Sequence, residues 1–323
     1  MLDARNKRIC VVGAGYWGKN HIRVLNQLRV LRGIVEVEKT PRNIILDTYK
    51  DINGHSKIED AIAEDYDGFV VATPAKTHFE IAKTIINAGK HILIEKPMTL
   101  SVKEAEELVN LAAKNKINAM VGHVLLFHPA VKKIKTMIKD GKIGNLQYLY
   151  SNRLNLGKVR TEENVFWSLA PHDIAIFQYL TDSTPIKINS TGSTFLQKGI
   201  ADSTMTQLEY KNGARGHVFV SWLHPFKEHR LVVIGSEAMI SFEDALDEKP
   251  LKLYSKKINL KSGIPEKIDG PVKVVPYENK MPLDMELEYF INHLSNVKPK
   301  VSDIRHGYEI VKTLVNASQQ ILK

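Results

Sequence analysis

The sequence predicts two domains, an α/β domain with a parallel sheet over residues 1–122 and an α+β domain with a mostly antiparallel sheet over residues 123–323. Two patterns predict this division. Up to Gly122, short apolar runs alternate with amphipathic stretches, as in βαβ units. Beyond about residue 146, strand-like runs are instead joined by short turns, as in hairpins. A length of 323 residues leaves room for a hydrophobic core in each domain.

Five short apolar runs are expected to form the parallel strands of the first domain. Stretches with helical spacing of apolar residues separate them, and two helix ends carry typical signals. Ser101 and Glu104 form a capping box at a helix start, and Gly89 is typical of a helix end. The expected strands are residues 8–12, 33–37, 67–73, 91–95 and 118–122.

The second domain is expected to begin with a helix and to continue as strands. Residues 123–145 have apolar side chains at helical spacing, and residues 306–322 are expected to form a closing helix. Pro171 fits the first position of a further helix. Two hairpins are expected, from runs 205–210 with 214–222 and 231–234 with 238–242.

Composition excludes several classes of function. About 25% of the residues are charged and 43% are apolar, which is typical of a globular protein. No apolar run is long enough to cross a membrane and the first residues lack a signal peptide, so we expect a cytoplasmic protein without a membrane partner. The single cysteine, Cys10, excludes an internal disulfide and cysteine-rich metal sites, and no metal is expected.

The formal net charge of +9 leaves two interpretations open. A basic surface attracts polyanions, but it also attracts small phosphorylated ligands. The lysines and arginines are scattered along the chain, and no nucleic-acid recognition motif accompanies them. We therefore expect no nucleic-acid partner, while an anionic substrate or cofactor agrees with the charge.

A glycine-rich segment directly follows the first expected strand and opens a helix. It reads Gly13-Ala14-Gly15-Tyr16-Trp17-Gly18. Gly13 permits a tight turn, Gly15 has no Cβ to obstruct a pyrophosphate, and Gly18 lets the helix pack on the strand. Phosphates would then lie at the positive end of the helix. At the start of an α/β domain, this segment predicts a Rossmann domain that binds a dinucleotide.

Glu36 stands at the end of the second expected strand. An acidic residue at this place accepts hydrogen bonds from the adenosine ribose hydroxyls and repels a 2′-phosphate, so NAD is preferred to NADP. Glu38 is an alternative, because its side chain would point to the same side of the strand. Lys39 and Arg42 could weaken the exclusion of NADP.

Lys96 lies in the segment Glu95-Lys96-Pro97, just after a strand of the same sheet. Ligands of open α/β sheets bind beyond the carboxyl ends of the strands, so Lys96 projects toward the expected position of the nicotinamide. The positively charged ring and partial desolvation would lower the pKa of this lysine. Lys96 is therefore a candidate to hydrogen-bond the substrate hydroxyl or to relay its proton. A surface lysine without such a role is the alternative.

His172 lies in the first turn of the helix that Pro171 is expected to begin. The positive end of that helix would keep the imidazole neutral and able to accept a proton. A structural histidine is the alternative. The adjacent Asp173 would point about 100° away, where it could orient a neighbour or cap the helix.

Several segments together resemble one family of oxidoreductases. In the first domain they are residues 13–18, Ala72-Thr73-Pro74 with His78, Ala88-Gly89-Lys90-His91, and Glu95-Lys96-Pro97. In the second domain they are residues 153–173, Ser221-Trp222, Arg230 with Gly235-Ser236, and Pro282-Leu283 with Glu286. In these segments the chain resembles the Gfo/Idh/MocA oxidoreductases over nearly its whole length.

The resemblance implies a fold, a class of reaction and an assembly. Family members have an N-terminal Rossmann domain and a C-terminal domain with a large open antiparallel sheet. Most are NAD(P)-dependent dehydrogenases of sugars, polyols or nucleotide sugars. They commonly form dimers or tetramers through the sheet, so a homodimer or homotetramer is expected.

The resemblance also implies roles for individual residues. Lys96 matches the family's catalytic lysine, and His172 matches its catalytic histidine. Many members carry an aspartate four residues before this histidine, where this chain has Ser168. The proton route would then rest on Lys96 and His172 alone, or use Asp173. The residues expected at the cofactor are Gly13, Gly15, Tyr16, Trp17, Gly18, Glu36, Thr73, Pro74, His78, Glu95 and Lys96.

Segments 122–130, 155–160, 163–167 and 170–173 resemble a nucleotide-sugar subgroup of the family. Its members oxidise C3 of UDP-N-acetylglucosamine or of the related uronate. Arginines and lysines suit a diphosphate or a carboxylate, and asparagines suit hydroxyls or an acetamido group. The residues expected at the substrate are Lys96, Arg153, Asn155, Lys158, Arg160, Asn164, His172 and Asp173.

Two other functions remain open from the sequence. One is a dehydrogenase of the same family that acts on a free sugar or polyol, which dependence on the UDP group would distinguish. The other is a cofactor-sensing regulator without turnover. The presence of both Lys96 and His172 disfavours the regulator.

Overall fold

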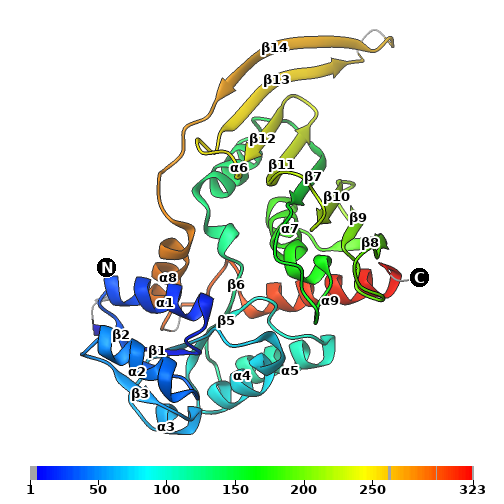
Figure 1. Cartoon of the computed structure of the whole chain (residues 1–323). Helices are drawn as coiled ribbons and strands as arrows, with labels where there is room; N and C mark the ends of the chain where they lie inside the picture. Colours follow the sequence, from blue (N-terminus) through cyan, green and yellow to red (C-terminus); the bar gives the residue numbers. More distant parts are fainter. Residues whose placement is uncertain (1–5, 261–262, 296, 322–323) are drawn as a thin grey trace. The chain divides into compact units, whose positions relative to one another are not determined.

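A computed structural model describes residues 6–260, 263–295 and 297–321 and divides the chain into two compact units. The first unit comprises Met1–Phe127 and Met281–Lys312, and the second comprises His128–Lys280 and Thr313–Lys323. The first unit is built on a parallel sheet and the second on a mostly antiparallel sheet, so the predicted fold class is confirmed (Figure 1).

The first unit contains a six-stranded parallel sheet with helices between the strands. The strand order is β3-β2-β1-β4-β5-β6, so the chain winds outward in one direction from β1 and in the other from β4. Every residue of β1, β4 and β6 is buried, as in parallel sheets covered on both faces. The strands are β1 (Ile9–Val12), β2 (Leu31–Val35), β3 (Asn53–His55), β4 (Gly68–Val71), β5 (His91–Glu95) and β6 (Ala119–Gly122).

The helices of the first unit begin where local signals predict them. The Ser101 hydroxyl accepts a hydrogen bond from the Glu104 N–H at 3.2 Å, as the capping box requires. Gly89 has a φ of +71° just after its helix ends. The elements are α1 (Tyr16–Gln27), α2 (Lys39–Thr48), α3 (Ile58–Ile62), η2 (Ala75–Thr77), α4 (His78–Asn87), α5 (Val102–Lys114) and η3 (Val124–Phe127).

Helix α8 (Pro282–Asn292) belongs to the first unit, whereas the sequence-based division assigns it to the second domain. The side-chain nitrogen of Asn118, which precedes β6, donates to three carbonyl oxygens in the segment after α8, at 2.7–2.8 Å. Leu287 and Phe290 of α8 are buried. Because these contacts join residues about 175 positions apart, the return of the chain could not be predicted from local pattern.

The second unit contains an eight-stranded sheet in the order β14-β13-β12-β11-β7-β10-β9-β8. All neighbours are antiparallel except β7 and β10. Helix α7 (Val165–Thr181) packs on β7, β9 and β10. The strands are β7 (Leu146–Leu154), β8 (Pro185–Ser193), β9 (Ser203–Tyr210), β10 (Arg215–Ser221), β11 (Glu228–Gly235), β12 (Met239–Glu243), β13 (Leu251–Asn259) and β14 (Glu266–Val274).

Both expected hairpins are present, as β9 with β10 and β11 with β12. In the first of them Gly213 has a φ of +86°, which explains the glycine at the turn. Strands β13 and β14 form a further ribbon that extends beyond the neighbouring strands of the sheet (Figure 1). The helix expected over residues 123–145 is instead η3 followed by α6 (Pro129–Lys139), because the His128 ring caps α6 by accepting from the Ala130 N–H at 3.1 Å.

Helix α9 (Ile304–Ile321) closes the chain and contributes residues to both units. It agrees with the expected helix over residues 306–322. Among the helices that the structure describes, none is long and apolar enough to span a membrane.

Candidate active site

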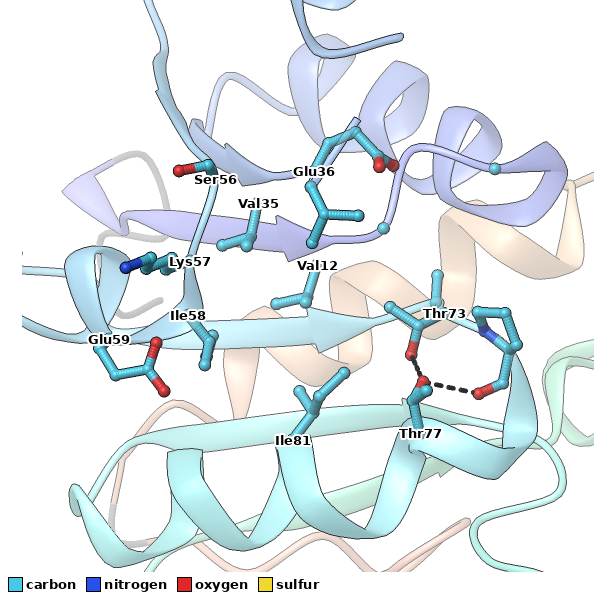
Figure 2. A pocket seen from close by; sticks show the side chains of 15 residues that line it. Val12, Val35, Glu36, Ser56, Lys57, Ile58, Glu59, Thr73, Thr77 and Ile81 are labelled. Atoms are coloured by element: carbon cyan, nitrogen blue, oxygen red, sulfur yellow. Dashed lines mark hydrogen bonds between the residues drawn. The ribbon is translucent and has the colours of Figure 1, made fainter. Parts of the chain in front are cut away.

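A cavity of about 510 Å³ lies in the first unit at the carboxyl ends of β1, β2 and β4 (Figure 2). This is where the strand order reverses, the place at which open α/β sheets bind ligands. Its lining combines the glycine-rich loop and the loop after β4 with an apolar floor. The lining residues are Val12, Gly13, Gly15, Val35, Glu36, Val37, Ser56, Lys57, Ile58, Glu59, Ala72, Thr73, Pro74, Thr77 and Ile81.

The three glycines of the loop are required for different reasons. Gly13 has a φ of +96°, and a Cβ there would lie 2.9 Å from the Thr73 methyl carbon. A Cβ at Gly18 would lie 2.0 Å from the Gly13 carbonyl oxygen, so only glycine lets α1 pack this closely. A Cβ at Gly15 would meet no protein atom within 4 Å. The space at Gly15 therefore fits a bound pyrophosphate, as the loop motif predicts.

The Glu36 carboxylate is held against the glycine-rich loop. The backbone N–H of Ala14 donates to one oxygen at 2.8 Å, and the N–H of Glu38 donates to the other at 3.1 Å. Glu36 lines the cavity, whereas Glu38 precedes α2 with an exposed side chain. Arg42 donates to the Glu36 carbonyl oxygen at 2.6 Å. Of the two acidic candidates, Glu36 is the one that a ribose in this cavity would meet.

Sequence reasoning missed one wall of the cavity, formed by residues 56–59 and Ile81. Figure 2 shows Ser56, Lys57 and Glu59 across the cavity from the glycine-rich loop. Residues 56–59 follow β3, a three-residue strand with the sequence Asn-Gly-His. Such a short polar strand carries no apolar alternation, so the loop after it could not be placed from sequence.

Other residues expected at the cofactor divide into two groups. Thr73 and Pro74 line the cavity, and the Thr77 hydroxyl donates to Thr73 Oγ1 at 2.8 Å (Figure 2). Tyr16 and Trp17 begin α1 with exposed side chains, outside the lining of this cavity.

His78 is buried, and its ring makes two contacts with the backbone. Nδ1 lies 2.9 Å from the Pro97 carbonyl oxygen, and Nε2 lies 2.8 Å from the Thr73 carbonyl oxygen. Burial lowers the pKa of this imidazole. Both ring nitrogens face protein oxygens. Neither is therefore available for the direct contact with a cofactor that was expected of His78.

Glu95 is likewise engaged within the protein. One carboxylate oxygen lies 2.8 Å from His21 Nε2, and the other accepts the Lys96 N–H at 3.1 Å. Glu95 and His21 are both buried. Lys96 itself is half-buried and is joined to Pro97 by a cis peptide bond. The Glu95 carboxylate therefore holds the backbone of Lys96. Both of its oxygens contact protein groups, and not the cofactor as was expected.

The expected position of His172 in its helix is wrong. Helix α7 begins at Val165, and Asn164 caps it by accepting a hydrogen bond from the Trp167 N–H at 3.1 Å. Pro171 lies inside the helix, so His172 is two turns from its start. The helix dipole acts mainly within the first turn and cannot account for a neutral His172. The cap also engages the side-chain oxygen of Asn164, a residue that was expected to bind the sugar.

Arg153 and Asp173 form a buried ion pair in the second unit. The guanidinium donates to both carboxylate oxygens at 2.9 and 3.0 Å, and the Ser151 hydroxyl donates to Asp173 at 2.5 Å. Burial, and then the charge of Arg153, lower the pKa of His229 to about 4. Arg153 and Asp173 were both expected at the substrate, but their charged groups neutralise each other instead. Asp173 is therefore a poor candidate for the proton route.

The segment between β7 and α7 contains the remaining substrate candidates. Lys158 and Arg160 have exposed side chains, and Asn155 is half-buried. The Arg160 carbonyl oxygen accepts from Gln197 Nε2 at 2.8 Å, which holds the segment to the loop after β8. These side chains are available to an anionic ligand.

The first unit also buries ionisable groups to which the sequence analysis assigned no role. Glu286 of α8 is completely buried, and neither of its oxygens has a hydrogen-bond partner among the described residues. Burial, and then the charge of Glu95, raise its pKa well above the ordinary value. His123 and His306 lie with ring centroids 6.0 Å apart, and burial lowers the pKa of His306 to about 4. No arrangement of three or more potential metal ligands occurs in the described parts of the chain.

Comparison with known proteins identifies the class. Residues 7–123 match the oxidoreductase family with an NAD-binding Rossmann fold, and residues 131–241 match the GFO/IDH/MocA C-terminal domain. The chain therefore belongs to the Gfo/Idh/MocA family of oxidoreductases, and NAD is the cofactor of its Rossmann domain. The expected family and enzyme class are confirmed.

Individual relatives differ in what they act on. The chain is 25% identical to the UDP-N-acetylglucosamine 3-dehydrogenase of Acidithiobacillus ferrooxidans over 299 residues, 92% of this chain and 91% of that one. A solved structure of that enzyme has a TM-score of 0.86 and covers 98% of this chain and 97% of its own, at 23% identity.

Two further relatives broaden the comparison. The inositol 2-dehydrogenase of Rhizobium meliloti is 24% identical over 61% of each chain. A protein from gentamicin A biosynthesis, solved in complex with NAD, has a TM-score of 0.80 and covers 97% of this chain and 94% of its own, at 20% identity.

Proposed function

We propose that the chain oxidises a secondary hydroxyl of a nucleotide sugar, and that C3 of UDP-N-acetylglucosamine or of its uronate is the preferred candidate. One observation carries the proposal: a dehydrogenase of UDP-N-acetylglucosamine matches 92% of this chain, at 25% identity. Exposed Lys158 and Arg160, in the segment before α7, supply the positive charge that a diphosphate needs.

The reaction requires the removal of a hydride from carbon and of a proton from the hydroxyl. Bound NAD supplies the hydride acceptor, which no protein side chain can replace. In the proposal His172 accepts the hydroxyl proton, and Lys96 holds the oxygen while negative charge develops on it. The product is the 3-keto sugar, and Glu36 favours NAD over NADP by repelling a 2′-phosphate.

The proposal is tested by mass spectrometry. The protein is incubated with NAD and either UDP-N-acetylglucosamine or its uronate, with and without 2-oxoglutarate as an oxidant for retained NADH. Loss of two hydrogens from one nucleotide sugar, with the ketone trapped by an oxime reagent, is the expected result. Lys96→Ala is expected to abolish this product while NADH still binds, which a cofactor-sensing regulator would not predict.

A free sugar or polyol is the second candidate substrate. The match to an inositol dehydrogenase favours it, although over a shorter part of the chain than the nucleotide-sugar enzyme. Turnover of inositol or a free sugar, with no change in either UDP-sugar, would replace the proposed substrate by this one.

We also propose that the second unit associates with a second copy of the chain through the open face of its sheet. Tyr148, Tyr150 and His217 lie half-buried on that face, and the rings of Tyr150 and His217 stack with centroids 5.1 Å apart. Light scattering after gel filtration is expected to give a dimer or tetramer. Tyr150→Lys is expected to give smaller particles, whereas Lys198→Glu, on an exposed loop, should not.

A further inference from the structure

The His78 ring lies between two loops with different roles in the proposed function. The loop of Thr73 lines the cofactor cavity, and the loop of Lys96 carries the proposed catalytic lysine. Nε2 of the ring faces the carbonyl oxygen of Thr73 at 2.8 Å. Its Nδ1 faces the carbonyl oxygen of Pro97, the residue after Lys96, at 2.9 Å. These two loops follow the neighbouring strands β4 and β5. A single side chain therefore joins the cofactor loop to the lysine loop.

The ring can act only on the backbone. The side chain is 1% exposed, so neither substrate nor cofactor reaches its nitrogens. Carbonyl oxygens only accept hydrogen bonds, so the two contacts are both hydrogen bonds only when both ring nitrogens carry a proton. A neutral ring donates to one loop at a time. Glu95 and Lys96 are the charged groups near the ring, with opposite effects on its protonation.

The lysine is already held on its other side. The Lys96 N–H donates to the Glu95 carboxylate at 3.1 Å, and His21 of α1 holds that carboxylate at 2.8 Å. Helix α1 begins at the glycine-rich loop. The N-terminal side of Lys96 is thus tied to one cofactor-binding element, and on its C-terminal side the Pro97 carbonyl oxygen faces the His78 ring.

We propose that His78 is a positioning residue that couples the Thr73 loop, where the cofactor binds, to the Lys96 loop. The proposal rests on the proposed role of Lys96 in oxidation. When Nδ1 carries the ring proton, its bond to the Pro97 carbonyl sets the direction of the Lys96 side chain, and when Nε2 carries it, its bond to the Thr73 carbonyl holds that backbone against the cofactor cavity. The two bonds therefore have separable consequences for chemistry and for cofactor binding.

Two conservative variants separate the two bonds. The amide nitrogen of asparagine takes the place of Nδ1, and that of glutamine takes the place of Nε2. His78→Asn keeps the bond to Pro97 and is expected to raise the NADH dissociation constant about three- to tenfold, with kcat within about twofold of wild type. His78→Gln keeps the bond to Thr73 and is expected to lower kcat about three- to tenfold, with NADH binding nearly unchanged.

A third measurement does not depend on the substrate. The rate at which Lys96 is reductively methylated, followed by peptide mass spectrometry, is expected to change at least about threefold in His78→Gln but not in His78→Asn. If the wild type oxidises no nucleotide sugar yet this difference appears, the proposed substrate fails and the positioning role of His78 stands.

Controls come from His91, at the other end of β5. Its Nδ1 accepts the Asn118 N–H at 2.9 Å, far along the strand from Lys96. His91→Asn and His91→Gln are expected to leave kcat, NADH binding and Lys96 methylation unchanged. Equal effects of the two His78 variants on all three readouts, or a loss of thermal stability alone, would overturn the proposal.

Discussion

Two sets of buried ionisable side chains, one in each unit, differ in their partners. In the second unit Arg153 and Asp173 are buried together, and the Asp173 carboxylate receives hydrogen bonds from the guanidinium and from Ser151. In the first unit Glu286, His123 and His306 are buried with ring nitrogens or carboxylate oxygens that have no hydrogen-bond partner in the described residues. The Arg153–Asp173 pair is thus buried with its charges matched, whereas Glu286, His123 and His306 are buried without such a partner in the described part of the chain. The contrast is between these two sets of groups, because the first unit also buries the pair of His21 and Glu95.

The difference shows which buried groups respond to mutation and which respond to pH. A paired buried charge is stable as long as both partners are present, and it becomes costly when one is removed. An unpaired buried group instead gives up its charge, which appears as a shifted pKa. Removal of a partner should therefore affect the Arg153–Asp173 pair most, and pH should reveal the neutral groups, which include His229 of the second unit.

The largest expected effect comes from Asp173→Asn. This change leaves the buried Arg153 guanidinium without a counter-charge, and it should lower the free energy of unfolding by about 3–5 kcal/mol. Urea unfolding followed by circular dichroism measures the loss. The double variant Arg153→Met with Asp173→Leu should lose less, because it leaves no unpaired charge. A smaller loss in Asp173→Asn than in the double variant would contradict this view of the pair.

Acid should destabilise the chain through buried neutral histidines. His306 in the first unit and His229 in the second each have a pKa lowered to about 4, chiefly by burial. Above the ordinary pKa of about 6.5 both are neutral whether folded or not. Below it the unfolded chain binds protons first, so stability should fall by up to about 1.4 kcal/mol per pH unit for each histidine until about pH 4.

Unfolding in urea at pH 7, 6, 5 and 4.5 measures this slope. His306→Gln cannot gain a charge and should flatten it, as should His229→Gln. If His306→Gln retained the full slope, His306 would not be the neutral buried group described here.

Glu286 should contribute the opposite pH dependence of stability, and Glu286→Gln should remove that contribution. Burial raises the pKa of Glu286, so the folded chain keeps its proton while the unfolded chain loses it above its ordinary pKa. The stability that protonated Glu286 contributes is present at low pH and is lost as pH rises. Glutamine never ionises, so the variant should gain stability relative to wild type as the pH rises from 5 to 8. Melting temperatures at the two pH values test the sign.

The smallest effect is expected from an exposed ion pair. Arg160 Nε and a Glu163 oxygen lie 3.8 Å apart, with both side chains partly exposed. Glu163→Gln should change the free energy of unfolding by less than about 0.5 kcal/mol. A loss comparable to that of Asp173→Asn would show that burial does not explain the difference between the two pairs.

Local pattern predicted the first unit better than the second. Five of its strands, its glycine-rich loop and the capping of α5 are encoded within short segments, where burial on both faces and turn geometry restrict the residue types. Strand β3 and helix α8 were missed. The first is too short and polar for periodicity, and the second joins the unit through contacts of Asn118 about 175 residues away.

The candidate site shows the same limit for individual side chains. Gly13, Gly15 and Glu36 line the cavity, because each follows the end of its own strand. His78 and Glu95 were expected at the cofactor, and Arg153 and Asp173 at the substrate, but in the structure their hydrogen-bond partners are protein groups elsewhere in the fold. The residue type shows that a side chain can donate or accept a hydrogen bond, but it does not show which group is the partner.

The sequence by itself determined the fold class and the glycine-rich loop of the Rossmann domain, because these follow from apolar periodicity, strand ends and glycines that act locally. The family followed from the resemblance of several segments to its members. Only the tertiary structure decided which polar groups remain available to a ligand. Arg153 and Asp173 are 20 residues apart, and His78 and Pro97 are 19 apart, yet each pair is in contact. Burying a charge or a hydrogen-bond donor without a partner costs free energy, so most buried polar groups are paired. Which group becomes the partner depends on the tertiary contacts of the fold.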